Sequence, residues 1–292
     1  MTETVFSDII IMYCYIHSQS DIGSELLRFP TLFRIQNLDR PKGTVTGMKK
    51  YEQRPVTVII AAAGSGSRMG SVYKPLMKLN GRHTLLYSLD KFMSCDCVER
   101  VVVSARREEL YLLREICARE NYPREILVVP GGENRQESVM LAFKAAFENR
   151  PKTRFTAVHD AARPLITREE FLRAYDAARL YGNVACACRA KDTFKRTDAD
   201  GLVIENVDRE NLWHIATPQI ADSDMLHTAM ALAKQNGELY TDESGMLTAA
   251  GFLVKLSEGS QANIKLTYPE DVAIAEAILA QRAEKSAPPA PQ

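Results

Sequence analysis

The sequence has no excess of charge of either sign. Lysine and arginine together number 37, as do aspartate and glutamate, so the formal net charge is zero. Proteins that bind along the phosphate backbone of a nucleic acid carry a basic surplus, and this chain has none. The balance argues against a nucleic-acid partner but permits local basic clusters that bind a small anion.

Long apolar stretches are also scarce. The stretch IIIMYCYI, residues 9–16, is far shorter than the ~20 apolar residues that a membrane span requires. Acidic Glu3 and Asp8 precede it, unlike the basic start of a secretory signal. We therefore expect no membrane partner. With 46% hydrophobic and 25% charged residues, the composition is that of an ordinary globular protein.

The six cysteines form no metal-binding or redox motif. Two pairs have C-x-C spacing, Cys95 with Cys97 and Cys186 with Cys188, whereas C-x-x-C is absent and no histidine stands at zinc-site spacing. The second pair alternates with alanines in NVACACRA, as on one face of a buried strand. We expect reduced core thiols in a cytoplasmic protein.

The two ends of the chain differ from the rest. Met48 opens MKKYEQRPVTVII, a short basic start that leads directly into a strand, so we interpret residues 1–47 as a non-native or disordered extension upstream of it. Residues 284–292 form a proline-rich tail without core-forming residues, which we expect to be disordered. Residues 48–283 then form the folded domain.

Between residue 56 and about residue 190, short apolar β-branched runs alternate with segments of helical periodicity. Strands are expected at 56–62, 98–105, 125–130, 155–160 and 183–188. Strands that are apolar on both faces and separated by helices predict an α/β fold with a Rossmann-like, mostly parallel sheet flanked by helices. The loops that follow such strands meet at one edge of the sheet, where open α/β folds bind ligands.

The alternation ends after Cys188. The segment DTFKRTDADGLVIENVDR, residues 192–209, has two strand-like halves around the turn sequence DADG. Because both of its sides are polar, we expect a hairpin that protrudes and needs a partner surface to order it. Helices at about 222–236, 242–250 and 269–283 and a strand at 252–257 complete the predicted domain.

The glycine-rich segment AAAGSGSRMG follows the first strand. A Rossmann fingerprint that starts at Gly64 and Gly66 would need glycine where Met69 stands, and a P-loop G-K-[ST] is also absent. Small residues in this place still let backbone N–H groups approach an anion. Arg68 and Lys74 add two cations that could flank a triphosphate, the alternative being two solvated surface charges.

A second loop, PGGENRQES, lies between a strand and a helix. Gly131 and Gly132 would let backbone groups reach a planar base or a sugar, and Ser138 lies near the helix start. Its hydroxyl could be a ligand or a helix cap. A tight turn with a cap is the structural alternative for the whole loop.

The third loop, VHDAARP, follows the strand expected at 155–160. Asp160 ends that strand, where a carboxylate can hold Mg²⁺ or a ribose hydroxyl, and Arg163 follows closely. Capping of a helix or turn is the alternative role for Asp160. We interpret His159 as structural, because a single histidine at a strand end is more often a hydrogen-bonded structural residue. Together, the three loops predict a nucleoside triphosphate site.

Six segments in this order resemble the motifs of the 2-C-methyl-D-erythritol 4-phosphate cytidylyltransferase family: AAAGSGSRMG…KPLMKLNG, PGGENRQESV, HDAARP, VDRENLWHIATPQ, TDESGML and NIKLTYPEDVAIAE. The resemblance covers about residues 55–281. It implies transfer of CMP from CTP to a sugar-alcohol phosphate, with Mg²⁺ as cofactor. It also implies a homodimer in which the hairpin at about 192–209 helps to complete the neighbour's substrate site.

The resemblance assigns roles to individual residues. Arg68 and Lys74 would stabilise the transition state at the triphosphate, and Asp160 is the candidate metal ligand. The nucleotide would contact Ala62, Ala63, Gly64, Gly66, Gly132, Glu133, Ser138, Asp160, Ala161 and Arg163. The sugar phosphate would contact Arg209, Thr217, Thr241 and Lys265, of which Arg209 and Lys265 also count as catalytic.

Two positions depart from the family pattern, and two other functions stay open. Glu133 stands where the family often has aspartate, and Ala262 and Asn263 supply no acid before NIK. A cytidylyltransferase for another polyol phosphate, such as ribitol 5-phosphate, shares the fold and many motifs. A non-catalytic nucleotide-binding subunit is the second alternative, although the four cations of the expected site are all present.

We expect Arg68→Ala and Lys74→Ala each to lower turnover by roughly 10²-fold or more while the fold is retained. The sugar phosphate would attack CTP at the α-phosphorus. Its second pKa is about 6, so it needs no general base, and the barrier is repulsion between two anions. Steady-state kinetics on both variants checks this, and near-normal turnover in either would contradict it.

Overall fold

The computed structural model describes residues 55–64 and 72–286. The expected extension at 1–47, the tail residues 287–292, and the predicted ligands Gly66 and Arg68 lie outside the described residues. In the described ranges, no helix combines the length and the apolarity that crossing a bilayer requires.

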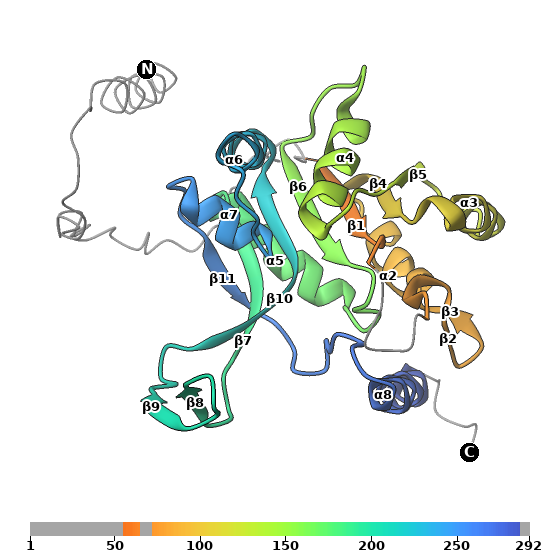
Figure 1. Cartoon of the computed structure of the whole chain (residues 1–292). Helices are drawn as coiled ribbons and strands as arrows, with labels where there is room; N and C mark the ends of the chain where they lie inside the picture. The colour runs from red at the N-terminus through yellow and green to blue at the C-terminus, as the bar shows by residue number, and fades with distance from the viewer. Residues whose placement is uncertain (1–54, 65–71, 287–292) are drawn as a thin grey trace, which may run out of the picture. The chain divides into compact units, whose positions relative to one another are not determined.

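A seven-stranded sheet forms the centre of the fold (Figure 1). Its strand order is β11-β7-β10-β6-β1-β4-β5. The strands are β1 (Val56–Ala61), β4 (Val98–Ala105), β5 (Ile126–Pro130), β6 (Phe155–Asp160), β7 (Val184–Arg189), β10 (Trp213–Asp222) and β11 (Lys255–Glu258). Only β10 among them runs antiparallel to its neighbours, which confirms the predicted mostly parallel α/β sheet.

Helices cover both faces of the sheet. One face packs against α2 (Thr84–Met93), α3 (Leu110–Arg119) and α5 (Arg168–Tyr181), with η3 (Arg107–Glu109) leading into α3. The other face packs against α4 (Arg135–Phe147), α6 (Ser223–Asn236) and α7 (Glu243–Ala249). Along β1, Val58 and Ile60 enter the first cluster and Ile59 the second, so the strand is buried on both sides as its apolar run predicts.

The strand β10 has no counterpart in the sequence-based prediction. Its sequence WHIATPQIAD contains Pro218, which cannot donate a ladder hydrogen bond and normally argues against a central strand. The pairing with β7 is irregular between Ile215 and Gln219, and the proline lies within that irregularity. The strand therefore tolerates the missing N–H at a place that pattern reading cannot identify.

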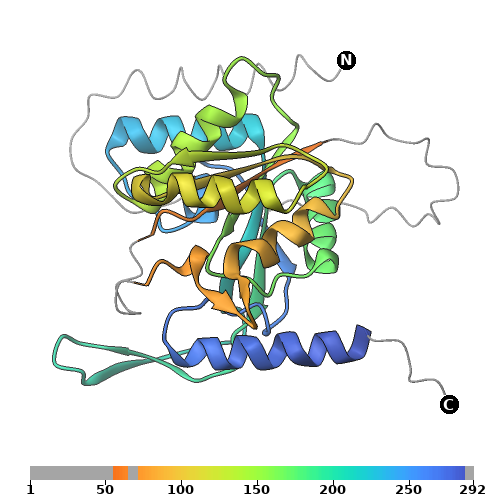
Figure 2. The same cartoon turned by 90° about the vertical axis from the view of Figure 1, so that its right-hand side faces the viewer.

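A small hairpin and the last helix lie apart from the main sheet. The hairpin joins β2 (Lys78–Leu79) to β3 (Arg82–His83), directly after η2 (Lys74–Leu76). Helix α8 (Glu270–Ser286) lies beside it (Figures 1 and 2) and extends three residues past the predicted domain end at 283. Leu79, Leu165, Leu266 and Ala275 form the buried cluster between these parts.

The predicted protruding hairpin is present. Strands β8 (Phe194–Thr197) and β9 (Val203–Val207) pair only with each other among the described strands, and both views show them extending away from the main sheet (Figures 1 and 2). Leu202, Val203 and Ile204 are more than 60% exposed. The hairpin thus contributes no buried core to its own chain.

The cysteines in the described ranges are free thiols, and all but Cys97 are buried. Burial raises the pKa of the Cys186 thiol to about 12 and that of the Cys117 thiol to about 11. These side chains therefore stay protonated at neutral pH and act as core residues, as predicted.

Candidate active site

A cavity of about 440 Å³ opens at the carboxyl edge of the sheet. It lies where β1, β5 and β6 end, which is the predicted ligand edge of an open α/β sheet. Its lining consists of Ala61, Ala62, Ala63, Gly64, Lys74, Pro75, Gly132, Glu133, Asn134, Arg135, Ser138, Asp160, Ala161, Ala162 and Lys265. The three predicted loops therefore converge on one site.

Small side chains at the ends of β1 and β6 form one wall of this cavity. The N–H of Ala62 donates to the Ser104 carbonyl at 2.8 Å, and that of Ala161 donates to the Ala61 carbonyl at 3.0 Å. These two N–H groups are committed to the sheet. Ala62 and Ala161 thus bring the backbone close to a ligand through their small size, not as anion-binding donors.

The loop after β5 is fastened by its own side chains. Asn134 is the N-cap of α4, since its side chain accepts from the Glu137 N–H at 2.9 Å. The buried Ser138 hydroxyl accepts from the Gly132 N–H at 3.0 Å and donates to the Asn134 carbonyl at 2.7 Å. Ser138 therefore lines the cavity and shapes the turn, whereas the helix cap is Asn134. Glu133 is exposed at the rim.

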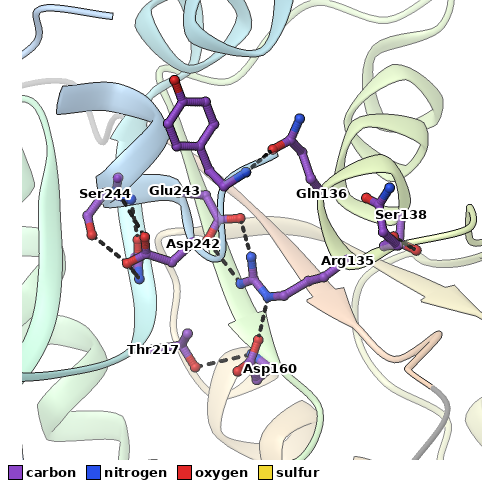
Figure 3. Close-up of polar contacts among 12 residues, drawn as sticks. Arg135, Gln136, Ser138, Asp160, Thr217, Asp242, Glu243 and Ser244 are labelled. Atoms are coloured by element: carbon purple, nitrogen blue, oxygen red, sulfur yellow. Dashed lines mark hydrogen bonds and ion pairs between the residues drawn. The ribbon is translucent and has the colours of Figure 1, made fainter. Parts of the chain in front are cut away.

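Arg135, Asp160, Lys265 and Glu243 form a charge cluster at the cavity, and Figure 3 shows Arg135 between Asp160 and Glu243. The Asp160 carboxylate accepts from Arg135 Nε at 2.9 Å through Oδ1 and from Lys265 Nζ at 2.8 Å through Oδ2. The same guanidinium donates its two terminal nitrogens to Glu243 at 2.8 and 3.0 Å. Residues from α4, β6, α7 and the segment before α8 are thus linked by consecutive ion pairs.

The charges of this cluster keep Asp160 ionised. Burial alone would raise the pKa of its carboxyl group, but the nearby Arg135 and Lys265 outweigh burial and hold the pKa below its usual range. Burial likewise opposes the charge on Arg135, and the carboxylates of Glu243 and Asp160 overcome that effect and raise its pKa. The cavity therefore contains a permanently charged network.

The two lysines of the site come from segments that touch each other. Lys74 Nζ donates to the Leu266 carbonyl at 2.7 Å, next to Lys265 in the chain. Leu266 is fully buried in the cluster under α8, so the segment that carries Lys265 is held from both sides. Lys74 and Leu266 are 192 residues apart in the sequence, and their contact brings Lys74 and Lys265 to the lining of the same cavity.

A smaller cavity of about 190 Å³ adjoins the first. It is lined by Arg135, Asp160, Arg163, Ile215, Ala216, Thr217, Gln219, Thr241, Asp242 and Lys265. Arg163 donates to the Asn263 carbonyl at 2.8 Å and lines this cavity, not the larger one. Arg135, Asp160 and Lys265 line both cavities and form the wall between them.

His159 supports this wall from the core. Its Nδ1 lies 3.0 Å from the Thr217 hydroxyl, which also accepts from the Asp160 N–H at 3.1 Å. Its Nε2 lies 3.3 Å from Ser88 Oγ, but both side chains are fully buried and thus closed to a substrate. Burial lowers the pKa of His159 to about 4, so it is neutral at neutral pH and structural, as predicted.

One predicted residue lies elsewhere in this chain. The Arg209 guanidinium donates to the Lys191 carbonyl at 2.5 Å at the base of the protruding hairpin, and Arg209 lines neither cavity. Conversely, Arg135 and Glu243 are not among the predicted site residues, yet they belong to the charge cluster. An arginine at the first position of a helix, where the macrodipole disfavours a cation, was the available signal for a carboxylate partner.

The fold and the site define an α/β nucleotidyltransferase. The cavity follows the strand ends of a Rossmann-like sheet, and Lys74 and Lys265 line it. This is the arrangement that direct transfer between two phosphates requires, because such a reaction needs positioning and charge stabilisation more than covalent catalysis.

Comparisons with known proteins give the family. A family model described as IspD, 2-C-methyl-D-erythritol 4-phosphate cytidylyltransferase, matches residues 56–281. A protein of that name from Caldanaerobacter subterraneus subsp. tengcongensis is 35% identical over 226 residues, covering 77% of this chain and 98% of its own length. Another from Pelotomaculum thermopropionicum is 36% identical over 229 residues, covering 78% and 95%.

Solved structures agree. The 4-diphosphocytidyl-2C-methyl-D-erythritol synthase of Anaerococcus prevotii matches with a TM-score of 0.69 and 28% identity, covering 78% of this chain and all of the other. The cytidylyltransferase of Francisella tularensis matches with a TM-score of 0.65 and 29% identity, covering 76% and 99%. The chain belongs to the 2-C-methyl-D-erythritol 4-phosphate cytidylyltransferase family.

Gly131 tests how closely the loops after β1 and β5 must pack. A Cβ at Gly131 would lie 2.4 Å from the Ala63 Cβ, whereas the atoms nearest to a Cβ at Gly132 belong to the exposed side chain of Glu137. We expect Gly131→Ala to lower the free energy of unfolding by about 1–3 kcal/mol, since the clash cannot relax by a rotamer change.

Gly132→Ala is the matched control, because the flexible Glu137 side chain can swing away. Chemical denaturation of both variants measures the difference. An equal or larger loss in the Gly132 variant would show that the contact between the two loops is not tight.

Proposed function

We propose that this chain transfers the CMP group from CTP to 2-C-methyl-D-erythritol 4-phosphate, releasing pyrophosphate. The observation that carries the proposal is the wall of Arg135, Asp160 and Lys265 shared by two adjoining cavities. The larger cavity suits the nucleotide and the smaller one the sugar phosphate. A reaction between them takes place across that wall, where a donor and an acceptor are held next to each other.

The residues of this chain act by binding, orientation and charge. Lys74 faces the triphosphate, and Lys265 faces the phosphate that attacks the α-phosphorus. Gly64 and Gly132 leave room for the nucleotide, and Thr241 lines the sugar pocket. A phosphate monoester is largely ionised at neutral pH, so proton removal is unnecessary and cations lower the barrier by offsetting anion repulsion.

A divalent cation, Mg²⁺, is part of this proposal, and Asp160 is its candidate ligand. Among the described residues, no group of three or more His, Cys, Asp or Glu side chains could hold a metal ion by protein ligands alone. Each Asp160 oxygen accepts one hydrogen bond and keeps a second lone pair. One carboxylate with substrate phosphate oxygens and water is a common donor set for Mg²⁺, so the residue fits a shared site. The ion would neutralise triphosphate charge.

We further propose that the hairpin acts on a second copy of the chain. Arg209 is a required cation by resemblance, yet it lies at the hairpin base and lines neither cavity of its own chain. The exposed apolar residues Leu202, Val203 and Ile204 offer a surface for a partner. A homodimer would bring Arg209 to the neighbour's sugar-phosphate cavity.

Pyrophosphate release on mixing the protein with CTP, Mg²⁺ and the sugar phosphate tests the function. We expect turnover with methylerythritol phosphate and much less with ribitol 5-phosphate. Lys265→Ala should raise the KM for the sugar phosphate by roughly tenfold or more, since a lost charge-assisted contact costs 1.5–3 kcal/mol. Faster turnover of ribitol 5-phosphate would favour the polyol-phosphate alternative, and no release with either would favour a non-catalytic subunit.

Mixing two inactive variants tests the dimer. Arg209→Ala and Lys74→Ala are each expected to be nearly inactive alone. After co-refolding, a mixed dimer has one site with Lys74 from one copy and Arg209 from the other, so about a quarter of the wild-type activity returns for random pairing. Absence of any recovery, with dimers verified by light scattering, would place both residues in the same chain's site.

A further inference from the structure

Arg135 occupies a position that the proposed reaction does not yet explain. It is the first residue of α4 and lines both cavities, yet its guanidinium is aimed at two carboxylates of its own chain (Figure 3). All three of its nitrogens donate, one to Asp160 and two to Glu243. A side chain fixed at both ends in this way is held in one orientation.

The anchor behind Arg135 is itself fixed. Glu243 is the first residue of α7, and its side chain is only 3% exposed. The preceding residue, Asp242, caps that helix because its carboxylate accepts a hydrogen bond from the Gly245 N–H at 3.0 Å. Gln219 of β10 donates to Asp242 at 2.9 Å. A continuous chain of contacts therefore runs from the central sheet through α7 to Arg135 and then to Asp160.

The two cations on Asp160 differ in how firmly they are held. The Lys265 side chain is 41% exposed and its ammonium donates to the Asp160 carboxylate, whereas the Arg135 side chain is 25% exposed and also donates to Glu243. An incoming phosphate can therefore recruit Lys265 more easily than Arg135. The carboxylate left behind is only 11% exposed, and a buried carboxylate without a counter-ion is costly.

We propose that Arg135 is a positioning residue that keeps Asp160 paired at the wall between the cavities, so that Lys265 can leave that carboxylate for the phosphate of the acceptor. This inference rests on the proposed function and adds a role that the reaction needs. Without Arg135, Lys265 is the protein cation left beside Asp160 and is retained there. Binding of the acceptor phosphate then competes against a partly buried ion pair.

The primary test is Arg135→Gln, measured by pyrophosphate release with CTP and 2-C-methyl-D-erythritol 4-phosphate varied separately. The KM for the sugar phosphate rises roughly tenfold or more, and by more than the KM for CTP, because Lys265 is held back. Arg135→Lys retains a charge beside Asp160 and shows a smaller rise. An unchanged sugar-phosphate KM in either variant overturns the inference, so the test survives if the glutamine variant does not fold.

A double variant separates positioning from general structural support. In Arg135→Gln with Asp160→Asn, no carboxylate retains Lys265, so the sugar-phosphate KM falls back toward the wild-type value while kcat remains low. A structural role would leave that KM as high as in the single variant, or higher, and this outcome also overturns the inference.

Arg82→Gln is the matched control. Arg82 also bridges two carboxylates, Asp90 at 2.9 Å and Glu120 at 2.6 Å, but it lines neither cavity. Its substitution should leave both KM values unchanged, and a rise equal to that of the Arg135 variant overturns the inference. A wild-type chain that releases no pyrophosphate would instead refute the proposed function, which distinguishes the two failures.

Discussion

The pairing of one buried carboxylate with two cations organises this site. Asp160 ends β6 with its side chain in a cavity, and an ionised group there is stable only when it is paired. Arg135 and Lys265 supply that pairing from segments more than 100 residues apart. The Thr217 hydroxyl accepts a hydrogen bond from the Asp160 N–H, so the backbone of Asp160 is held in place as well as its side chain. Both cavities take their shared wall from this arrangement.

The carboxyl edge of the sheet was predictable from sequence because it follows from local patterns. Apolar strands alternate with helices, and each loop that follows a strand carries small or charged residues. Parallel connections then place these loops at one edge, which the cavity confirms for the loops at Ala62, Gly132 and Asp160. The strand β10 was not predictable, since Pro218 and polar neighbours conceal it.

The arrangement of side chains at that edge was less accessible. Arg135 lies in the segment PGGENRQESV, but its partner Glu243 is 108 residues away, and the position of Arg135 at a helix start does not indicate which carboxylate it pairs with. Ser138 was a candidate ligand or cap; the cap is Asn134, and the Ser138 hydroxyl fastens the turn while its residue lines the cavity. Arg163 lines the smaller cavity, where its guanidinium donates to the carbonyl of the distant Asn263. Long-range contacts of this kind decide which pocket a charged residue faces.

The packing of α8 has a consequence for how this protein can be shortened or fused. Leu79 lies five residues after Lys74, and Leu266 lies directly after Lys265. Both leucines are buried together with Ala275 of α8. Helix α8 thereby supports the segments that carry both lysines, although none of its residues lines either cavity. We therefore expect a truncation that removes α8 to expose this cluster and loosen the segments that carry Lys74 and Lys265, so a fusion partner is better joined after the helix than in its place.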